Sequence, residues 1–198
     1  MEQTSDKKLT RVSEDALLIR NILDGHPEQF RVLADRYGQQ VMELVGRIIP
    51  QAEDVEEAVQ DTLMETYQSL QRFDSQKANF RTWLLRIAYH TALKRLRDKS
   101  HMQFVDVEPM QLEAIADPSI DALLSDTTPD RLALLEQAIH QLAPPDQMLL
   151  SLYYHDDRPL REIAYIVGHD DSYLRSRLQW LRKKISNLII TLEKNGNQ

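Results

Sequence analysis

The sequence predicts an all-α protein made of two small helical domains. Apolar residues recur at three- and four-residue steps along most of the chain, and no stretch alternates between apolar and polar residues as a half-buried strand does. The 198 residues include only 5 Gly and 8 Pro, which suits helices better than sheets with many tight turns. The periodicity lapses in one acidic stretch. We therefore expect domains at 13–99 and 130–190, a linker at 100–129, and flexible tails at 1–12 and 191–198.

The composition excludes several kinds of protein. The chain has no cysteine, so disulfides, thiolate zinc sites and cysteine nucleophiles are ruled out. The polar N-terminal stretch has no apolar segment of the kind found in a signal peptide. No apolar run approaches the roughly 20 residues that a membrane-spanning helix needs. We expect a soluble, cytoplasmic protein that does not insert into membranes.

Residues that favour helix starts and ends set the bounds of the expected helices in the first domain. Ser13 is a natural N-cap, and Gly25 follows the end of the first helix. Pro27 suits the first turn of a second helix, and Pro50 ends it. The expected helices span 13–24, 27–49, 53–72 and 81–99, with a polar loop at 73–79 between the last two.

The second domain is expected to hold four shorter helices. Helical periodicity resumes at Arg131 and is broken by the Ala-Pro-Pro-Asp-Gln stretch at 143–147. Another helix follows from about Met148, and two more lie on either side of Gly168. The stretch between the two domains has three prolines and no sustained period, so we expect a linker with at most one short helical piece.

Charged residues gather in four blocks of alternating sign, although the formal net charge is −7. Residues 53–65 contain six acids and no base, and residues 81–99 contain six bases and one acid. Residues 104–130 contain seven acids and no base, and residues 172–184 contain five bases and no acid. A single block is usually a solvated face, but four in this order favour separate surfaces for partners of opposite charge.

The third expected helix carries a row of carboxylates. At 100° per residue, four of them fall within about 80° of one another: Asp54, Glu57, Asp61 and Glu65. We expect this side to be exposed and the opposite side to be buried. Such a row repels phosphate, so it is either solvated or docks on a basic protein surface.

The fourth expected helix has an apolar side and a basic side. Phe80, Trp83 and Leu84 are expected in the core. The polar side suits a nucleic-acid backbone and holds Arg81, Arg86, His90, Lys94, Arg95 and Arg97. The loop at 73–79 is a candidate for accepting an unstacked base.

The stretch Leu160–Lys184 has the order of a helix-turn-helix motif: a short helix, a glycine turn and a long basic helix. Gly168 permits the positive φ that ends the first helix, and Asp170 or Asp171 can cap the second. On that second helix Leu174, Leu178, Leu181 and Ile185 cluster on one side, which we expect to be buried. The other side suits base edges and phosphates. An ordinary helix pair with a solvated basic face is the alternative.

Two segments of the first domain, EDVEEAVQDTLMETYQSLQRFD and FRTWLLRIAYHTALKRLR, resemble region 2 of the bacterial sigma-70 family. Residues 135–185 are similar to region 4 of that family. No region 3 fits between the two, an arrangement that identifies the chain as a member of the extracytoplasmic-function (ECF) group of sigma factors. The resemblance covers most of the chain.

The resemblance implies a role for each charged surface. Region 2 docks on core RNA polymerase through the acidic helix, here through Asp54, Glu57, Gln60 and Asp61. The loop and basic helix melt and read the −10 promoter element, here through Lys77, Asn79, Arg81, Arg86, His90, Lys94 and Arg97. Region 4 reads the −35 element, here through Ser172, Arg175, Ser176, Arg177, Gln179, Arg182 and Lys183, with Arg177 meeting phosphate. The implied partners are core polymerase, promoter DNA and an anti-sigma protein. No cofactor, metal or catalysis is implied.

The chain departs from the family pattern at three places. Tyr89-His90 stands where Arg-Asn is frequent, and residues 170–174 read Asp-Asp-Ser-Tyr-Leu in place of Ser-x-Gly-Thr-Val. Trp180 replaces a frequent basic residue; it either packs on the chain's own C-terminal turns or meets a protein partner. These departures bear on the promoter sequence that is read, not on the fold.

Three other functions fit parts of the sequence. The two His-Asp-Asp triplets, at 155–157 and 169–171, suggest a metal enzyme, but both fall at expected helix ends and lack the spacing of helical ligands. A stand-alone helix-turn-helix regulator would leave the acidic row without a purpose. An anti-sigma or adaptor protein would not need two basic helices of the DNA-binding type.

Overall fold

The computed structural model describes residues 14–100 and 128–196, which form two helical units. The N-terminal unit comprises residues 14–100 and Tyr165–Gly168, and the C-terminal unit comprises the rest of residues 128–196. The described residues contain helices and no strand, so the predicted all-α class is confirmed.

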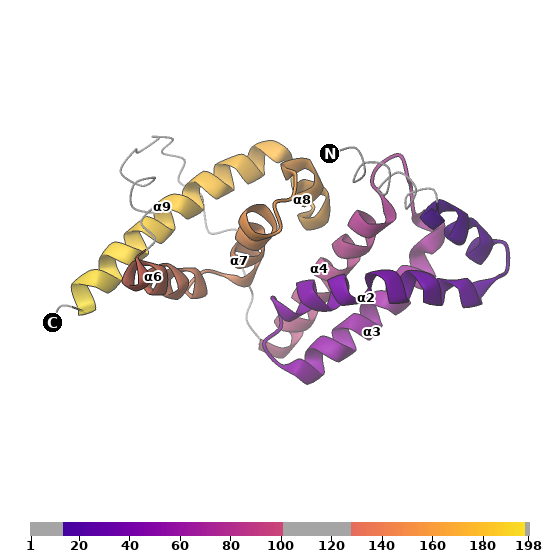
Figure 1. The fold of residues 1–198 in the computed structure, drawn as a ribbon, viewed down its shortest axis with the longest axis horizontal. Coiled ribbons are helices and arrows are strands. Elements are labelled where there is room, and N and C mark those ends of the chain that lie inside the picture. The colour runs from indigo at the N-terminus through magenta and orange to yellow at the C-terminus, as the bar shows by residue number, and fades with distance from the viewer. Residues whose placement is uncertain (1–13, 101–127, 197–198) are drawn as a thin grey trace. The chain divides into compact units, whose positions relative to one another are not determined.

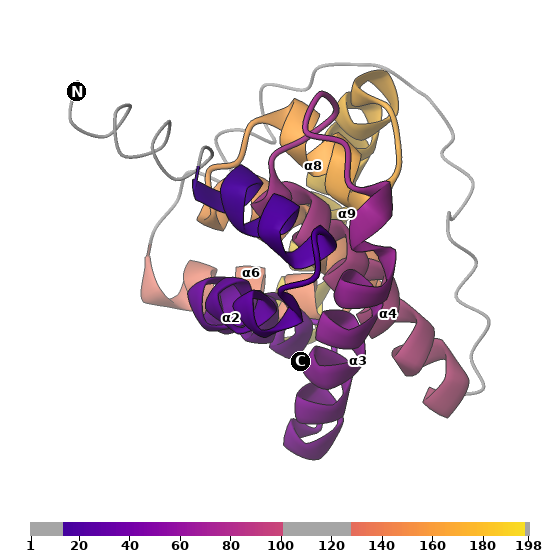
Figure 2. The ribbon, with the colours of Figure 1, turned by 90° about the vertical axis from the view of Figure 1, so that its right-hand side faces the viewer.

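The helices of the N-terminal unit follow the predicted punctuation. Residues 14–23 are helical, and Gly25 adopts a positive φ of 104° just beyond them. Ser13, the expected cap, lies outside the described residues. The remaining helices are η1 (Pro27–Gln29), α2 (Phe30–Gly46), α3 (Ala52–Ser69), η2 (Leu70–Arg72) and α4 (Phe80–Ser100). Helices α2, α3 and α4 pack against one another, as both views show (Figure 1, Figure 2).

An aromatic cluster closes one part of this core. The loop residue Phe73 contacts Phe80 and Trp83 of α4, with ring centroids 5.8 and 5.4 Å away. Tyr37 of α2 lies 5.6 Å from Phe80. Phe80 and Trp83 are only 2% and 8% exposed, which confirms their predicted place in the core. The cluster fixes the start of α4 beneath the loop that precedes it.

A buried hydrogen bond joins the first helix to α2. The hydroxyl of Tyr37 donates to Oδ2 of Asp15 at 2.5 Å, and Arg36 donates to Oδ1 of the same carboxylate at 2.5 Å. Burial, followed by the hydrogen bond and the charge of Asp15, raises the pKa of Tyr37 to about 12. The carboxylate is therefore satisfied on both oxygens although it is buried.

The helices after residue 128 are α6 (Pro129–His140), α7 (Pro144–Leu150), the π-helical turn η3 (Ser151–His155), α8 (Leu160–Val167) and α9 (Asp171–Gly196). Proline stands in the first turn of both α6 and α7, where its missing N–H costs no helical bond. Long helix α9 packs against α6 and α7. Its predicted apolar stripe is buried, with Leu174 and Leu181 no more than 1% exposed.

Two boundaries differ from the expectation: α7 begins at Pro144, within the stretch expected to break the helix, and α9 runs beyond residue 190. Helix α9 continues to Gly196, so residues 191–196, expected to be a tail, are helical. The apolar stripe of α9 continues past Ile185 to buried Ile189, so burial supports the helix one turn further than predicted. The tail 1–12 and linker positions 101–127 lie outside the described residues. Within the described ranges no helix is long and apolar enough to cross a membrane.

Candidate functional site

The buried side of α3 is rotated toward the row of carboxylates, relative to the opposite side that was expected to be buried. Its buried residues include Ala58, Thr62 and Thr66, which recur every fourth residue. The two threonine hydroxyls donate to the carbonyl oxygens of Ala58 and Thr62, at 2.7 and 2.6 Å, so their polarity is satisfied within the helix. This small-residue stripe allows close packing, and it takes Asp54, one turn earlier on the same side, into the interface.

Asp54 is therefore a correction to the predicted docking row. The residue is only 5% exposed. Its Oδ1 atom pairs with the ammonium of Lys99 and lies 3.9 Å from Nε of Arg95, both on α4. A buried carboxylate needs such partners, because desolvation without compensation is costly. Asp54 thus joins α3 to α4 and is not offered to a partner.

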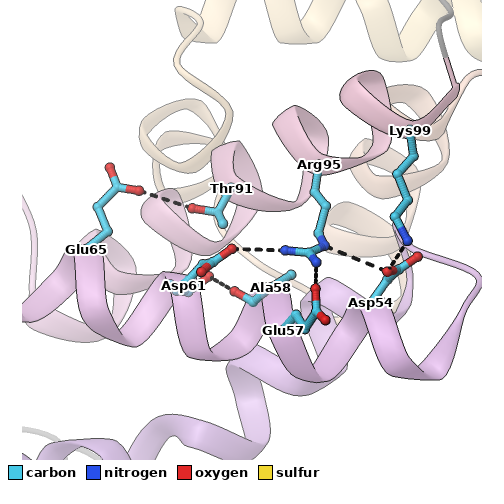
Figure 3. Close-up of polar contacts among 9 residues, drawn as sticks. Asp54, Glu57, Ala58, Asp61, Glu65, Thr91, Arg95 and Lys99 are labelled. Atoms are coloured by element: carbon cyan, nitrogen blue, oxygen red, sulfur yellow. Dashed lines mark hydrogen bonds and ion pairs between the residues drawn. The ribbon is translucent and has the colours of Figure 1, made fainter.

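Arg95 holds two further carboxylates of the row, as Figure 3 shows. Its Nη1 lies 3.0 Å from Oδ2 of Asp61, and its Nη2 pairs with Oε2 of Glu57. Thr91, one turn earlier on α4, donates to Oε2 of Glu65 at 3.3 Å. Arg95 was expected on the nucleic-acid side of α4, but its side chain points toward α3 (Figure 3).

The outward side of α3 still offers acids. The side chains of Glu57 and Asp61 are 63% and 56% exposed, and Gln60 is also exposed. Met64 and Tyr67 are exposed on the following turns, at 57% and 44%. At 100° per residue these apolar side chains lie within about 40° of Gln60. The exposed surface is therefore acidic toward the start of α3 and apolar toward its end, a combination that the charge pattern alone did not reveal.

Four other basic residues of α4 lie on the side away from Arg95 and Lys99. By helical step, four of the predicted residues fall within about 80° of one another and roughly opposite Arg95 and Lys99: Arg86, His90, Lys94 and Arg97. His90, Lys94 and Arg97 are exposed, and Arg86 is partly exposed. One helix thus separates two sets of bases: one neutralises the α3 acids and the other forms a basic stripe.

The three predicted residues around the loop have structural contacts of their own. Asn79 precedes α4 and caps it, because its Oδ1 accepts hydrogen bonds from the amide and hydroxyl of Thr82 at 2.9 and 3.0 Å. Arg81 donates from Nε to Oε1 of Gln40 on α2 at 2.5 Å. Lys77 is exposed and lies 3.7 Å from a carboxylate oxygen of Asp74.

The helix-turn-helix order predicted in the C-terminal unit is present. Gly168 follows α8 and adopts a φ of 82°, which a side chain would disfavour. Asp170 then caps α9, accepting a hydrogen bond from the amide of Tyr173 at 2.7 Å. The side of α9 away from the leucines carries exposed Ser172, Arg175 and Gln179, and partly exposed Ser176, Arg182 and Lys183. Among the residues that the structure describes, Arg175 makes no ion pair.

Arg177 is the second correction. It was assigned to phosphate, but it is 4% exposed and pairs with Asp146 of α7 through two hydrogen bonds, of 2.8 and 2.7 Å. Its guanidinium carbon also lies 4.1 Å from the ring centroid of Trp180, and Nζ of Lys184 lies 4.8 Å from the same centroid. Partly exposed Trp180 therefore packs on neighbouring turns of its own helix, one of the two roles proposed for it.

The His-Asp-Asp triplets have structural contacts in the C-terminal unit. Asp170 caps α9, and Asp156 pairs with Arg158 at 3.4 Å. His169 packs its ring 4.3 Å from that of Tyr173. Across residues 14–100 and 128–196, no three His, Asp or Glu side chains gather as a metal site would require.

Comparison with known proteins relates both units to one family. The model of sigma-70 region 2 matches residues 33–102, a range that contains α3 and α4 entirely. The chain is 25% identical over 180 residues to the ECF RNA polymerase sigma factor SigW of Bacillus subtilis, with 86% of this chain and 96% of that protein covered. It is 26% identical over 187 residues to the ECF RNA polymerase sigma-E factor of Haemophilus influenzae, covering 88% and 95%.

The chain belongs to the sigma-70 family, in its ECF group. Two solved structures share the fold of this sigma factor. CnrH, solved in complex with the cytosolic domain of CnrY, gives a TM-score of 0.57 at 22% identity over 88% of this chain and 96% of that one. The sigma factor RpoE of Bartonella quintana, solved with the anti-sigma factor NepR, gives 0.54 at 16% identity over 82% and 97%.

The match to region 2 places two surfaces of this sigma factor in one family segment. The exposed acids of α3 and the basic stripe of α4 both lie within residues 33–102, and the helix-turn-helix of α8 and α9 lies beyond it. The sigma factor thus has one acidic and two basic surfaces on its described residues.

Proposed function

We propose that this ECF sigma factor directs core RNA polymerase to specific promoters and starts transcription by using its three charged surfaces separately. The observation that carries the proposal is the division of charge within the region 2 match. The exposed acids of α3 pair with Arg95 on one side of α4, and the basic stripe lies on the opposite side of that helix. A protein that must hold a basic protein surface and DNA at once needs that separation.

The outward side of α3 is the proposed docking surface for core polymerase. Glu57, Gln60 and Asp61 supply its polar part, and exposed Met64 and Tyr67 supply an apolar part. Buried contacts usually carry the affinity of an interface, while charges at the rim steer the encounter. Asp54 drops out of the proposed surface because it is buried and already paired.

The basic stripe of α4 is the proposed −10 surface. Arg86, His90, Lys94 and Arg97 lie along one side of the helix, a spacing that suits successive backbone phosphates. Lys77 within the loop at 73–79 and Arg81 just after it add positive charge where an unstacked base can be held. Asn79 acts there chiefly as the cap that fixes the start of α4.

Helix α9 is the proposed reader of the −35 element. Arg175 and Gln179 are exposed one turn apart and carry the groups that bind guanine and adenine edges in a major groove. Ser172, Ser176, Arg182 and Lys183 lie on the same side and suit phosphate or base contacts. Arg177 supports α9 from within and is not part of the proposed DNA surface.

The proposal also implies a regulatory partner and a cellular compartment. We expect an anti-sigma protein to bind this chain, since the related fold of RpoE is solved with NepR and that of CnrH with CnrY. We also expect the protein to work in the cytoplasm, where core polymerase meets the genome, and to catalyse no reaction itself.

The test is transcription in vitro. Purified protein is added to bacterial core RNA polymerase on fragmented genomic DNA from the source organism, and transcript starts are mapped with and without the protein. Discrete new starts that depend on the protein, preceded by shared −10 and −35 sequences, are the expected result. Failure to bind core polymerase would contradict the proposal and favour a stand-alone helix-turn-helix regulator.

A further inference from the structure

The guanidinium of Arg95 lies between two exposed carboxylates of α3. Nη1 lies 3.0 Å from Oδ2 of Asp61, and Nη2 pairs with Oε2 of Glu57 (Figure 3). The two acids are one helical turn apart, and a planar guanidinium has the fork geometry to bind both. We propose that Arg95 is a positioning residue for core-polymerase docking: it fixes Glu57 and Asp61 in the orientation that the polymerase surface binds. This inference rests on the proposed docking surface of α3.

Exposure separates these two acids from the third one that Arg95 approaches. The side chains of Glu57 and Asp61 are 63% and 56% exposed, whereas that of Asp54 is 8% exposed. Arg95 itself is mostly covered, with 21% of its side chain exposed. A carboxylate has several acceptor sites, so one that binds Arg95 can still accept a partner's hydrogen bond. Arg95 thus orients the two acids without hiding them.

Orientation lowers the cost of docking. An exposed glutamate or aspartate normally samples several rotamers, and ordering them at an interface consumes part of the binding energy. Arg95 orders both side chains before the partner arrives. Affinity differences among variants of one interface lie mostly in the dissociation rate, so losing Arg95 should mainly speed dissociation.

A simple count of charges predicts the opposite change in affinity for core polymerase when Arg95 is removed. Removing Arg95 makes the α3 surface more negative, which strengthens the long-range attraction for a basic partner and speeds association at low salt. A positioning role predicts weaker binding in spite of that added attraction. The sign of the change in affinity therefore distinguishes positioning from simple charge screening.

Lys99 supplies a matched control on the same helix. Its ammonium pairs with buried Asp54 and, among the described residues, with neither Glu57 nor Asp61. Lys99→Gln removes the same charge from the α3–α4 interface as Arg95→Gln does, but it leaves the exposed acids held. We expect the core dissociation rate of Lys99→Gln to stay within twofold of wild type.

The experiment measures association and dissociation of the full chain with core polymerase at low and at physiological salt. Arg95→Gln is expected to raise the dissociation rate about fivefold and to leave the association rate unchanged or faster. Arg95→Lys, whose ammonium is a single point charge, is expected to fall between wild type and Arg95→Gln. Circular dichroism and urea unfolding confirm that each variant is folded. Tighter or unchanged binding by a folded Arg95→Gln variant would overturn the proposal.

A mutant cycle tests whether Arg95 acts through the two acids. In the Glu57→Gln/Asp61→Asn background, Arg95→Gln is expected to add almost nothing to the dissociation rate. A full fivefold effect in that background would mean that Arg95 acts only on the fold, which overturns the inference and leaves the docking surface standing. If Glu57→Gln/Asp61→Asn binds core polymerase as wild type does, both the docking surface and the inference are wrong.

Discussion

Arg177 and Asp146 form a buried ion pair with two hydrogen bonds that joins α9 to α7. Nε of Arg177 donates to Oδ1 of Asp146 at 2.8 Å, and Nη2 donates to Oδ2 at 2.7 Å. Both residues are less than a tenth exposed. The pair lies one turn from Leu174 and Leu181, so it holds α9 at the same place where the apolar core does.

Removing one partner should destabilise the C-terminal unit strongly. Asp146→Ala leaves a guanidinium buried without its carboxylate, which should lower the free energy of unfolding by about 3–5 kcal/mol. The double change Asp146→Leu/Arg177→Met replaces the pair with apolar side chains and should recover most of that loss. Urea unfolding followed by circular dichroism measures both. Equal stability of Asp146→Ala and wild type would show that the pair contributes little.

The sequence predicted the helices well, because their signals are local. Prolines at the starts of helices, glycines after their ends and the leucine stripe of α9 all act within a few residues. Helix α9 was predicted to end too early, because the mostly polar residues from 191 onward give no apolar stripe. Among the described residues of α9, the last buried one is Ile189.

The site was harder to predict, because a helical wheel does not say what lies opposite each residue. Asp54 lies on the side of α3 that a stripe of Ala58, Thr62 and Thr66 brings into the interface. Its burial is stabilised by the bases of α4, which a helical wheel of α3 does not show. Arg177 lies about 40° from Leu181 on the wheel, and its place in the core depends on Asp146, 31 residues earlier. The small-residue stripe was a usable signal in the sequence; the Asp146 pair was not.

Reversing one charge on α3 should impair docking. Asp61→Arg places a second guanidinium beside Arg95 and faces the polymerase with a like charge, so the affinity for core polymerase should fall at least tenfold. Asp35→Arg on α2 changes an exposed acid by the same charge and should have little effect. Equilibrium binding to core polymerase compares the two variants. An equal loss in both would mean that net charge, not the α3 surface, governs the affinity.

Truncating one exposed base of α9 should weaken promoter reading alone. Arg175→Ala should cost about 1–3 kcal/mol in binding of the holoenzyme to DNA that carries the −35 element, with unchanged affinity for core polymerase. Arg31→Ala, on α2, removes an exposed base outside the proposed surfaces and serves as the control. DNA binding by preassembled holoenzyme is the measurement. A loss of affinity for core polymerase in Arg175→Ala would mean that the assignment of Arg175 to a DNA surface alone is wrong.

Alkaline pH should loosen the attachment of the first helix to α2 through Tyr37. Its pKa is about 12 in the folded protein and about 10 in an unfolded chain. Between those values the unfolded state releases the proton first, so the free energy of unfolding falls as pH rises from 10 toward 12. The stabilisation is fully present below pH 10, and about 1–2 kcal/mol of it should be lost by pH 12. Tyr37→Phe lacks this proton, so its stability should fall less over the same window. Parallel urea titrations of the two proteins at pH 9 to 12 measure the difference; identical slopes would mean that the hydroxyl does not stabilise the fold through Asp15.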